Sequence, residues 1–172
     1  MIDGEIVMHS PVNLRHADLL NFLDHLLRSY LELKKLGRLY REVVAVRLSV
    51  RQVYMPDLAF FTVDQLSALK PTYAPLAPTL VVEALSPGTA QNDVGDKFAA
   101  YELHGVREYW VLDPDHLAHR FYKREGELLV EFAAGAERIP AQTVPGFFLK
   151  RGWLDPANLP DASQCLTEIC SG

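Results

Sequence analysis

One carboxylate interrupts the most apolar stretch of the chain. Glu83 stands inside residues 80–85, Leu-Val-Val-Glu-Ala-Leu, which have the character of a buried strand. A carboxylate in such a strand is costly unless it is paired, protonated or bound to a metal ion. Two ordinary explanations stay open for Glu83 taken alone: a strand that turns this face outward, or a salt bridge to a core arginine.

A second carboxylate begins another apolar run. Asp57 follows Pro56 and opens the segment Leu-Ala-Phe-Phe at residues 58–61. Two carboxylates, a backbone carbonyl and waters are the ligands that Mg²⁺ requires of a protein. Asp after Pro is also a common turn residue, so Asp57 alone would carry little weight. Together with Glu83, it predicts a site for Mg²⁺ or Mn²⁺.

A lysine on the next predicted helix could complete this site. At about 100° per residue, Lys97 lies near Tyr101 at the border of the inward face, and Asp93 lies one turn earlier. An inward lysine needs an acidic partner, and Glu83 is one crossover away. The alternative is a surface lysine that pairs with Asp93 at a spacing of four.

Three further residues are second-tier candidates: His16, Asp93 and Tyr101. His16 falls on the apolar stripe of the first predicted helix and could line the same cavity, although a lone histidine there is more often a hydrogen-bonded core residue. Tyr101 could shape the pocket, although aromatic residues at periodic positions are usually core. The other histidines lack ligand spacing, so a zinc hydrolase is not expected.

The elements that must position these residues follow from apolar periodicity. A long helix is expected from Ser10-Pro11 to Gly37, and a half-exposed strand over residues 40–50. Residues 79–113 read as strand, helix and strand, with the helix over 92–104 ending at Gly105, which predicts parallel neighbours in one sheet. Two further strands, 117–122 and 128–132, form a meander. The fold class is α/β (α+β), a mixed β-sheet flanked by helices.

Composition limits the classes of protein that fit. The 172 residues, 49% hydrophobic and 23% charged, predict a single folded domain over residues 1–172. No stretch has the length and apolarity of a membrane span, and the N-terminus does not resemble a signal peptide, so no membrane partner and a cytoplasmic location are expected. Cys165 and Cys170 indicate neither a disulfide framework nor a zinc site.

The net charge of −5 argues against a protein that coats nucleic acid by bulk electrostatics. It does not exclude a local basic strip. Arg47 with Arg51, or Lys123 with Arg124, could still meet phosphates beside an acidic metal site.

Several motifs resemble a known family when read together. They are Pro56-Asp57, residues 82–87 (Val-Glu-Ala-Leu-Ser-Pro), Asp93 with Lys97 and Tyr101, and residues 105–114. They resemble the Uma-two family of restriction-endonuclease-like proteins, a branch of the PD-(D/E)XK nuclease superfamily. The resemblance runs from Asp3-Gly4-Glu5, through Ser10-Pro11 and His16, to Pro145-Gly146-Phe147.

The resemblance implies a restriction-endonuclease-like fold and a metal-dependent endonuclease that hydrolyses DNA. In that superfamily an Asp and a Glu bind Mg²⁺, which match Asp57 and Glu83, and a Lys helps to activate the attacking water. The superfamily Lys position, two residues after Glu83, is Leu85 here. The Uma-two family also lacks a Lys at this position and places it on the following helix. The corresponding residue of this chain is Lys97. A homodimer is expected by analogy alone.

Two rival hypotheses come from other classes of protein. The acidic charge and Leu85 favour a catalytically degenerate nuclease fold that acts as a nucleic-acid-binding or protein-interaction module. The second rival is a structural protein in which Glu83 and Lys97 form a buried ion pair. Metal binding separates the first hypothesis from both rivals.

Overall fold

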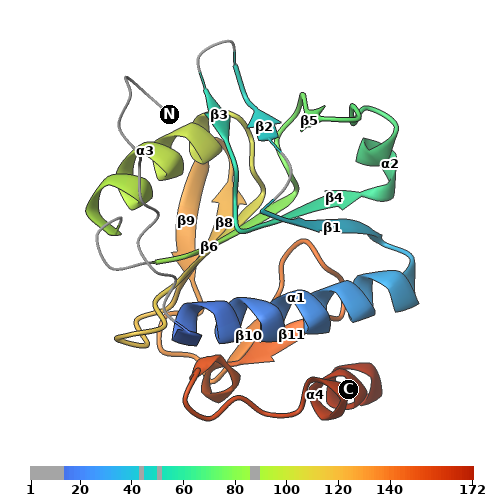
Figure 1. Ribbon diagram of the computed structural model, residues 1–172, viewed down its shortest axis with the longest axis vertical. Coiled ribbons are helices and arrows are strands. Elements are labelled where there is room, and N and C mark those ends of the chain that lie inside the picture. Colours follow the sequence, from blue (N-terminus) through green and yellow to red (C-terminus); the bar gives the residue numbers. More distant parts are fainter. Residues whose placement is uncertain (1–13, 43–44, 50–51, 86–89) are drawn as a thin grey trace.

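The computed structural model describes residues 14–42, 45–49, 52–85 and 90–172, with side chains from residue 95 onward in the last range. Runs of strands are separated by helices along the chain (Figure 1). Their bounds are α1 Leu14–Lys34, β1 Gly37–Arg41, β2 Ala45–Arg47, β3 Val53–Tyr54, β4 Leu58–Thr62, α2 Val63–Leu66, β5 Tyr73–Ala74, β6 Leu80–Ala84, α3 Ala90–Leu103, β7 Glu108–Leu112, β8 Arg120–Glu125, β9 Leu128–Phe132, β10 Arg138–Pro140, β11 Phe148–Lys150, the 3-10 helix η1 Arg151–Leu154 and α4 Ala162–Ser171.

The central sheet has six strands in the order β1-β4-β6-β7-β8-β9. Strands β6 and β7 are parallel, as expected for two strands joined by the crossover helix α3, and the other neighbours are antiparallel. Smaller sheets are formed by β3-β2-β5 and by β10-β11. The predicted mixed β-sheet flanked by helices is therefore confirmed.

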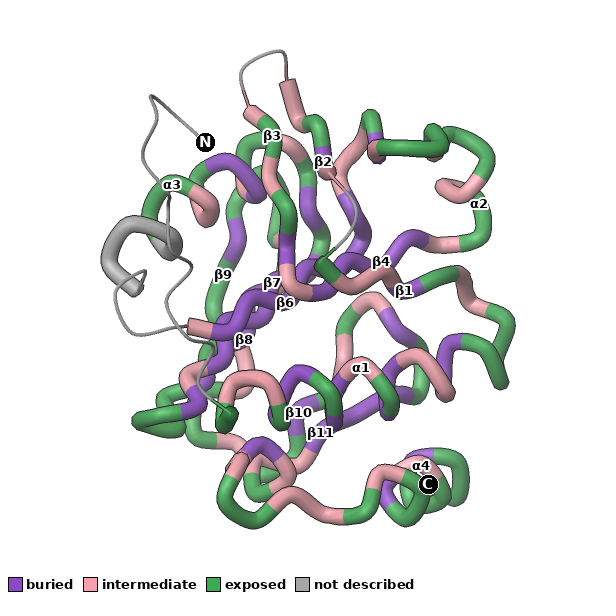
Figure 2. Tube along the Cα trace, in the orientation of Figure 1, coloured by how far each residue is buried: buried purple, intermediate pink, exposed green. Residues whose placement is uncertain are grey.

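The two faces of the central sheet are covered by different elements. Leu80 and Val82 of β6 face α1 and join Trp110 in the larger core cluster. The intervening Val81 faces α3, beside Tyr101. Buried residues run along the middle strands, with α1 on one side and α3 with the β2–β3 hairpin on the other (Figures 1 and 2). This alternation decides which side chains β6 presents to α3.

Helix α1 supplies most of one core layer. Its leucine stripe is buried against the sheet, and burying each such side chain contributes roughly 1.5–3 kcal/mol. The buried residues are Leu19, Leu20, Phe22, Leu23, Leu26, Leu27, Tyr30 and Leu31. Helix α4 supplies Cys165 and Ile169 to the same cluster. The predicted start of the first helix at Ser10-Pro11 lies outside the described residues.

The single strand predicted over residues 40–50 is wrong, because the segment contributes to two sheets. Strand β1 ends at Arg41, and Glu42 takes a left-handed conformation with φ of 50° that interrupts the extended chain. Val46 of β2 is then fully buried in a separate cluster with Ala59 of β4. The sequence patterns did not predict β3, β5, β10, β11, η1 or α4.

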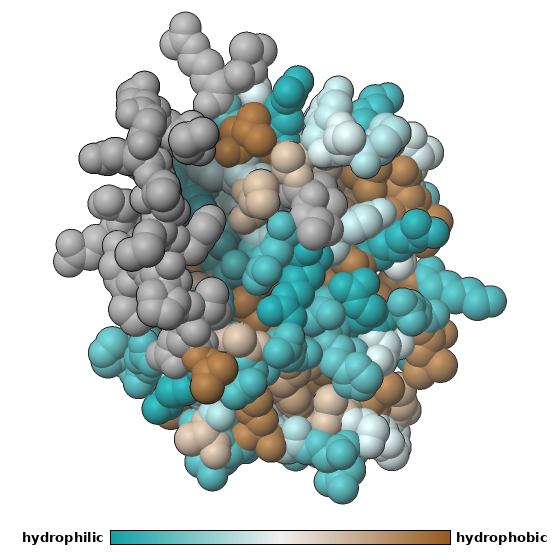
Figure 3. Space-filling model, in the orientation of Figure 1, coloured by the Kyte–Doolittle hydropathy of each residue, from teal (hydrophilic) through white to brown (hydrophobic). Residues whose placement is uncertain are grey.

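Within the described part of the chain, no helix combines the length and apolarity that a membrane span needs. Hydrophilic residues cover much of the face shown in Figure 3, with apolar residues interspersed among them.

Gly37 gives a test of the β1–β4 pairing. Its φ is +147°, and a Cβ added there would lie 2.0 Å from the carbonyl oxygen of Phe61 on β4. We expect Gly37→Ala to lower the free energy of unfolding by about 2 kcal/mol or more, as measured by urea denaturation. Gly126→Ala is the control, since its φ is also positive but nothing lies within 4 Å of the added atom. Equal losses in both variants would contradict the assigned packing.

Candidate functional site

Strand register brings the two predicted carboxylates together. In the antiparallel pair β4–β6, Leu58 lies opposite Val82, so continuing the register by one residue places Asp57 opposite Glu83. Residues directly opposite each other in an antiparallel pair point to the same face. A hydrogen bond of 2.7 Å from the backbone N–H of Ala84 to Oδ2 of Asp57 fixes this arrangement.

Helix α3 supplies two partners to Glu83. Lys97 Nζ donates to Glu83 Oε2 at 3.1 Å, and the hydroxyl of Tyr101 donates to Oε1 at 2.9 Å. The two donors lie one helical turn apart on the crossover helix that follows β6. Glu83 is 6% exposed, so both of its carboxylate oxygens are held inside the protein. The structure therefore joins Glu83, Lys97 and Tyr101 directly, with Asp57 beside them.

Tyr101 is itself held in place by aromatic side chains. Its ring contacts Tyr54 of β3 and Tyr109 of β7 edge-on, with ring centroids 5.7 and 5.2 Å apart. Burial, followed by the neighbouring charge of Glu83, raises the pKa of Tyr101 above its ordinary value. The phenol consequently keeps its proton and acts as a donor to Glu83. Tyr54 was not predicted, because only the β2–β3 pairing brings it here.

Burial governs the ionisation of both carboxylates. It raises the pKa of Glu83 to about 7, against the nearby Lys97 charge that lowers it, while Asp57 raises it further. Burial also raises the pKa of Asp57, opposed by the Ala84 N–H and by the charges of His16 and Lys97. Both carboxyl groups therefore keep their protons to a higher pH than usual. A bound cation would stabilise their ionised forms.

His16 reaches the same end of β6 from the opposite layer. Its Nδ1 lies 3.4 Å from the carbonyl oxygen of Leu85, and its charge lowers the pKa of Asp57. His16 therefore lies near the carboxylate of Asp57, at the end of β6. Asp93 lies in α3, but its side chain is outside the described residues, and so is any pairing between Asp93 and Lys97.

Glu42 is a neighbour that the sequence analysis missed. Its backbone N–H donates to the carbonyl oxygen of Asp57 at 3.1 Å, and its charge contributes to raising the pKa of Asp57. Its side chain is 53% exposed and lies 3.6 Å from Nε of Arg41. No spacing in the sequence signals this contact, because it depends on the register between β1 and β4.

The donor set suits a hard divalent cation such as Mg²⁺ or Mn²⁺ better than it suits zinc. Across the residues that the structure describes, no three His, Cys, Asp or Glu side chains are grouped to hold a metal ion. Zinc sites normally use three or four such protein ligands, whereas Mg²⁺ is commonly held by one or two carboxylates and keeps several waters. Asp57 and Glu83 therefore fit Mg²⁺ or Mn²⁺.

The two predicted basic strips differ in structure. Arg47 lies with its guanidinium 4.8 Å from the ring centroid of Tyr73, and its proposed partner Arg51 is outside the described residues. Lys123 and Arg124 are adjacent in β8 and both line a pocket at the other end of the strands. Lys123 and Arg124 therefore lie away from the carboxylate site.

The raised pKa of Glu83 predicts a pH dependence of stability. An acid with a higher pKa when folded binds more protons in the native state, so the free energy of unfolding falls as pH rises between the two values. For Glu83 this window runs from 4.5 to about 7. We expect the wild-type protein to lose stability relative to Glu83→Gln as the pH rises from 4.5 to about 7, as measured by urea denaturation. Parallel profiles of the two proteins would contradict the assigned burial.

Comparison with known proteins gives the family. A family model described as "Uma2: Putative restriction endonuclease" matches residues 1–152. The fold is similar to a crystal structure of "a putative nuclease belonging to DUF820" from Anabaena variabilis ATCC 29413, with a TM-score of 0.68 and 19% identity, covering 89% of this chain and 87% of that chain. No curated protein matches the chain. Since the family model spans most of the sequence, the chain belongs to the Uma2 family of restriction-endonuclease-like nucleases.

Proposed function

We propose that this protein is a divalent-metal-dependent endonuclease that hydrolyses DNA phosphodiester bonds at Asp57, Glu83 and Lys97. The observation that carries the proposal is the buried contact of Lys97 with Glu83, directly across the strand pair from Asp57. A cation and two carboxylates that converge at the end of buried strands are suited to phosphoryl chemistry. Membership of a nuclease family supports the same reaction class.

Each side chain has a distinct task in this proposal. Asp57 and Glu83 would hold Mg²⁺ or Mn²⁺, which when bound supplies Lewis-acid stabilisation to the attacking oxygen and the phosphate. Lys97 would place its ammonium beside the oxygen on which negative charge develops. Tyr101 orients Glu83 through Oε1, so Oε2 stays directed towards Lys97.

The substrate follows from the family rather than from the charge of the whole chain. A net charge of −5 does not favour tight binding to DNA over a broad surface. We therefore propose that DNA is engaged locally, close to the carboxylate site. A homodimer, which would present two sites to two strands, and a cytoplasmic location stay predictions.

Cleavage assays test the catalytic assignment. We expect nicking of plasmid DNA in the presence of Mg²⁺ or Mn²⁺, and a fall in kcat of about 100-fold or more in Lys97→Met, since a preorganised charge at the reacting atoms is lost. Lys70→Met is the matched control, because Lys70 is exposed and does not contact the site. Activity that is unchanged in Lys97→Ala or Glu83→Ala would exclude the assignment. Linear, single-stranded and branched DNA would define the substrate.

Metal binding is tested separately from turnover. We expect calorimetric titration with Mn²⁺ to give a binding isotherm that Asp57→Asn abolishes while circular dichroism shows a folded protein. One observation favours the rival in which Glu83 and Lys97 form a purely structural ion pair: the two side chains already contact each other. A folded wild-type protein that shows no heat of binding would support the two rivals, the degenerate nuclease fold and the structural protein.

A further inference from the structure

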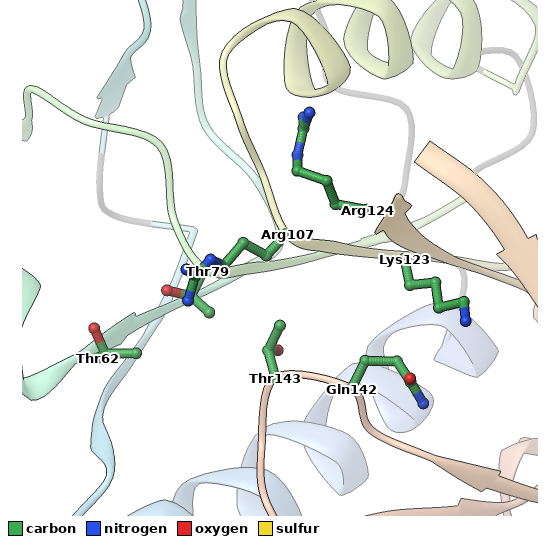
Figure 4. A pocket seen from close by; sticks show the side chains of 7 residues that line it. All are labelled: Thr62, Thr79, Arg107, Lys123, Arg124, Gln142 and Thr143. Atoms are coloured by element: carbon green, nitrogen blue, oxygen red, sulfur yellow. The ribbon is translucent and has the colours of Figure 1, made fainter. Parts of the chain in front are cut away.

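A second polar hollow lies at the opposite end of the parallel strands from the carboxylate site. It has a volume of about 540 Å³ and is lined by Thr62, Thr79, Arg107, Lys123, Arg124, Gln142 and Thr143 (Figure 4). A smaller hollow of about 320 Å³ adjoins it and shares Thr62, Thr79 and Arg107. Thr79 precedes Glu83 by four residues of strand, about 13 Å at 3.3 Å per residue. The hollow is therefore separate from the candidate catalytic site.

The lining is cationic, although the chain as a whole is acidic. Three of its seven residues are Arg or Lys and none is Asp or Glu, whereas the net charge of the protein is −5. A local concentration of positive charge in a concave surface raises the affinity for anions. Bulk composition therefore does not explain the charge of this hollow.

Arg107 is the side chain best placed to bind an anion. It is exposed, and among the described residues no acceptor receives a hydrogen bond from its guanidinium. A guanidinium offers five donors in a planar fork that matches a phosphate group. Its own backbone N–H donates to the carbonyl oxygen of Thr79 at 3.1 Å, so the base of the side chain is fixed at the sheet edge.

The other two cations differ in what they offer. Arg124 is used structurally, since its guanidinium donates to the carbonyl oxygens of Val106, Glu102 and Glu127 at the end of α3. Lys123 pairs with Glu125 at 2.9 Å, but both groups are partly exposed, and such a surface pair is weak. Lys123 can therefore turn to a ligand, while Arg124 contributes fixed charge.

The floor of the hollow is preorganised by a buried carboxylate. Glu108 is fully buried, and its Oε2 accepts hydrogen bonds from the backbone N–H groups of Gln142 and Thr143 and from the Thr143 hydroxyl. Its Oε1 accepts from Trp110 Nε1 at 2.8 Å. These donors compensate its charge and hold the turn at residues 142–143 rigidly against β7.

The remaining polar groups favour a ligand larger than phosphate. The Thr143 hydroxyl donates to Glu108 and the Thr79 hydroxyl donates to Gln65, so each hydroxyl oxygen has only its acceptor capacity left for a ligand in the hollow that both residues line. Acceptors suit the sugar hydroxyl or base amino groups of a nucleotide. Figure 4 shows Arg107 and Lys123 at different ends of the hollow, which an extended ligand would span.

We infer that this hollow binds a nucleotide, with Arg107 as the phosphate ligand and Lys123 as a second cation that contacts another part of the nucleotide. The nucleotide could be free or could be the 5′-phosphorylated end of a strand. The inference does not depend on catalysis at Glu83, because the two sites lie at opposite ends of β6.

Calorimetric titration of the full chain tests the inference at fixed low salt. We expect deoxyadenosine 5′-monophosphate to bind, deoxyadenosine not to bind, and Arg107→Gln to weaken binding about tenfold or more, as a lost charge-assisted contact requires. Arg38→Gln is the matched control, because Arg38 is an exposed arginine of β1 outside this hollow. Glu83→Gln is expected to bind normally, which separates this result from failure of the proposed nuclease activity.

Oligonucleotides with and without a 5′-phosphate identify the source of the phosphate. Stronger competition by the phosphorylated strand indicates a strand end, and equal weak competition indicates a free nucleotide; both outcomes support the site. The inference is overturned if no phosphate compound binds, if Arg107→Gln binds as the wild type does, or if Arg38→Gln loses as much affinity.

Discussion

The pairing of β4 with β6 is the constraint on which the rest of the site depends. It sets Asp57 opposite Glu83 and lets the N–H of Ala84 reach the Asp57 carboxylate. A slip of one residue would turn one carboxylate to the α1 face, among the leucines of the largest core cluster. Packing of that apolar layer therefore fixes the polar site on the other side of the sheet.

Two glutamates are deeply buried among the residues that the structure describes, and their partners give them different characters. Glu108 is surrounded by neutral donors from a turn, a hydroxyl and an indole. Glu83 instead meets an ammonium and a phenol, opposite a second acid. Burial raises the pKa of Glu108, and its neutral donors oppose that rise, whereas a cation beside paired acids creates a site whose ionisation responds to ligands.

Much of this arrangement could be predicted from the sequence. The strand, helix and strand around Glu83 follow from the apolar periodicity of the sequence and from the residues that end each element, such as Gly105. The turn of an α-helix then sets Lys97 and Tyr101 on one face. Local patterns could not reveal that Glu42 lies beside Asp57, since that contact depends on strand register. They also could not reveal that Glu108, the first residue of β7, is buried as deeply as Glu83. The start of α4, by contrast, has a local sequence signal: Asp161 is an N-cap residue whose side chain accepts hydrogen bonds from the backbone N–H groups of Ser163 and Gln164.

The donors of Glu108 have a consequence for how the chain can be divided. Residues 142–143 lie between β10 and β11, far along the sequence from β7. Their backbone N–H groups nevertheless donate hydrogen bonds to the carboxylate of Glu108, at the start of β7 in the main sheet. Removing this hairpin would leave the Glu108 side chain with the Trp110 indole N–H but without its donors from residues 142–143. The hairpin is accordingly an obligatory part of the folding unit, and any fusion boundary or circular permutation has to be placed outside it.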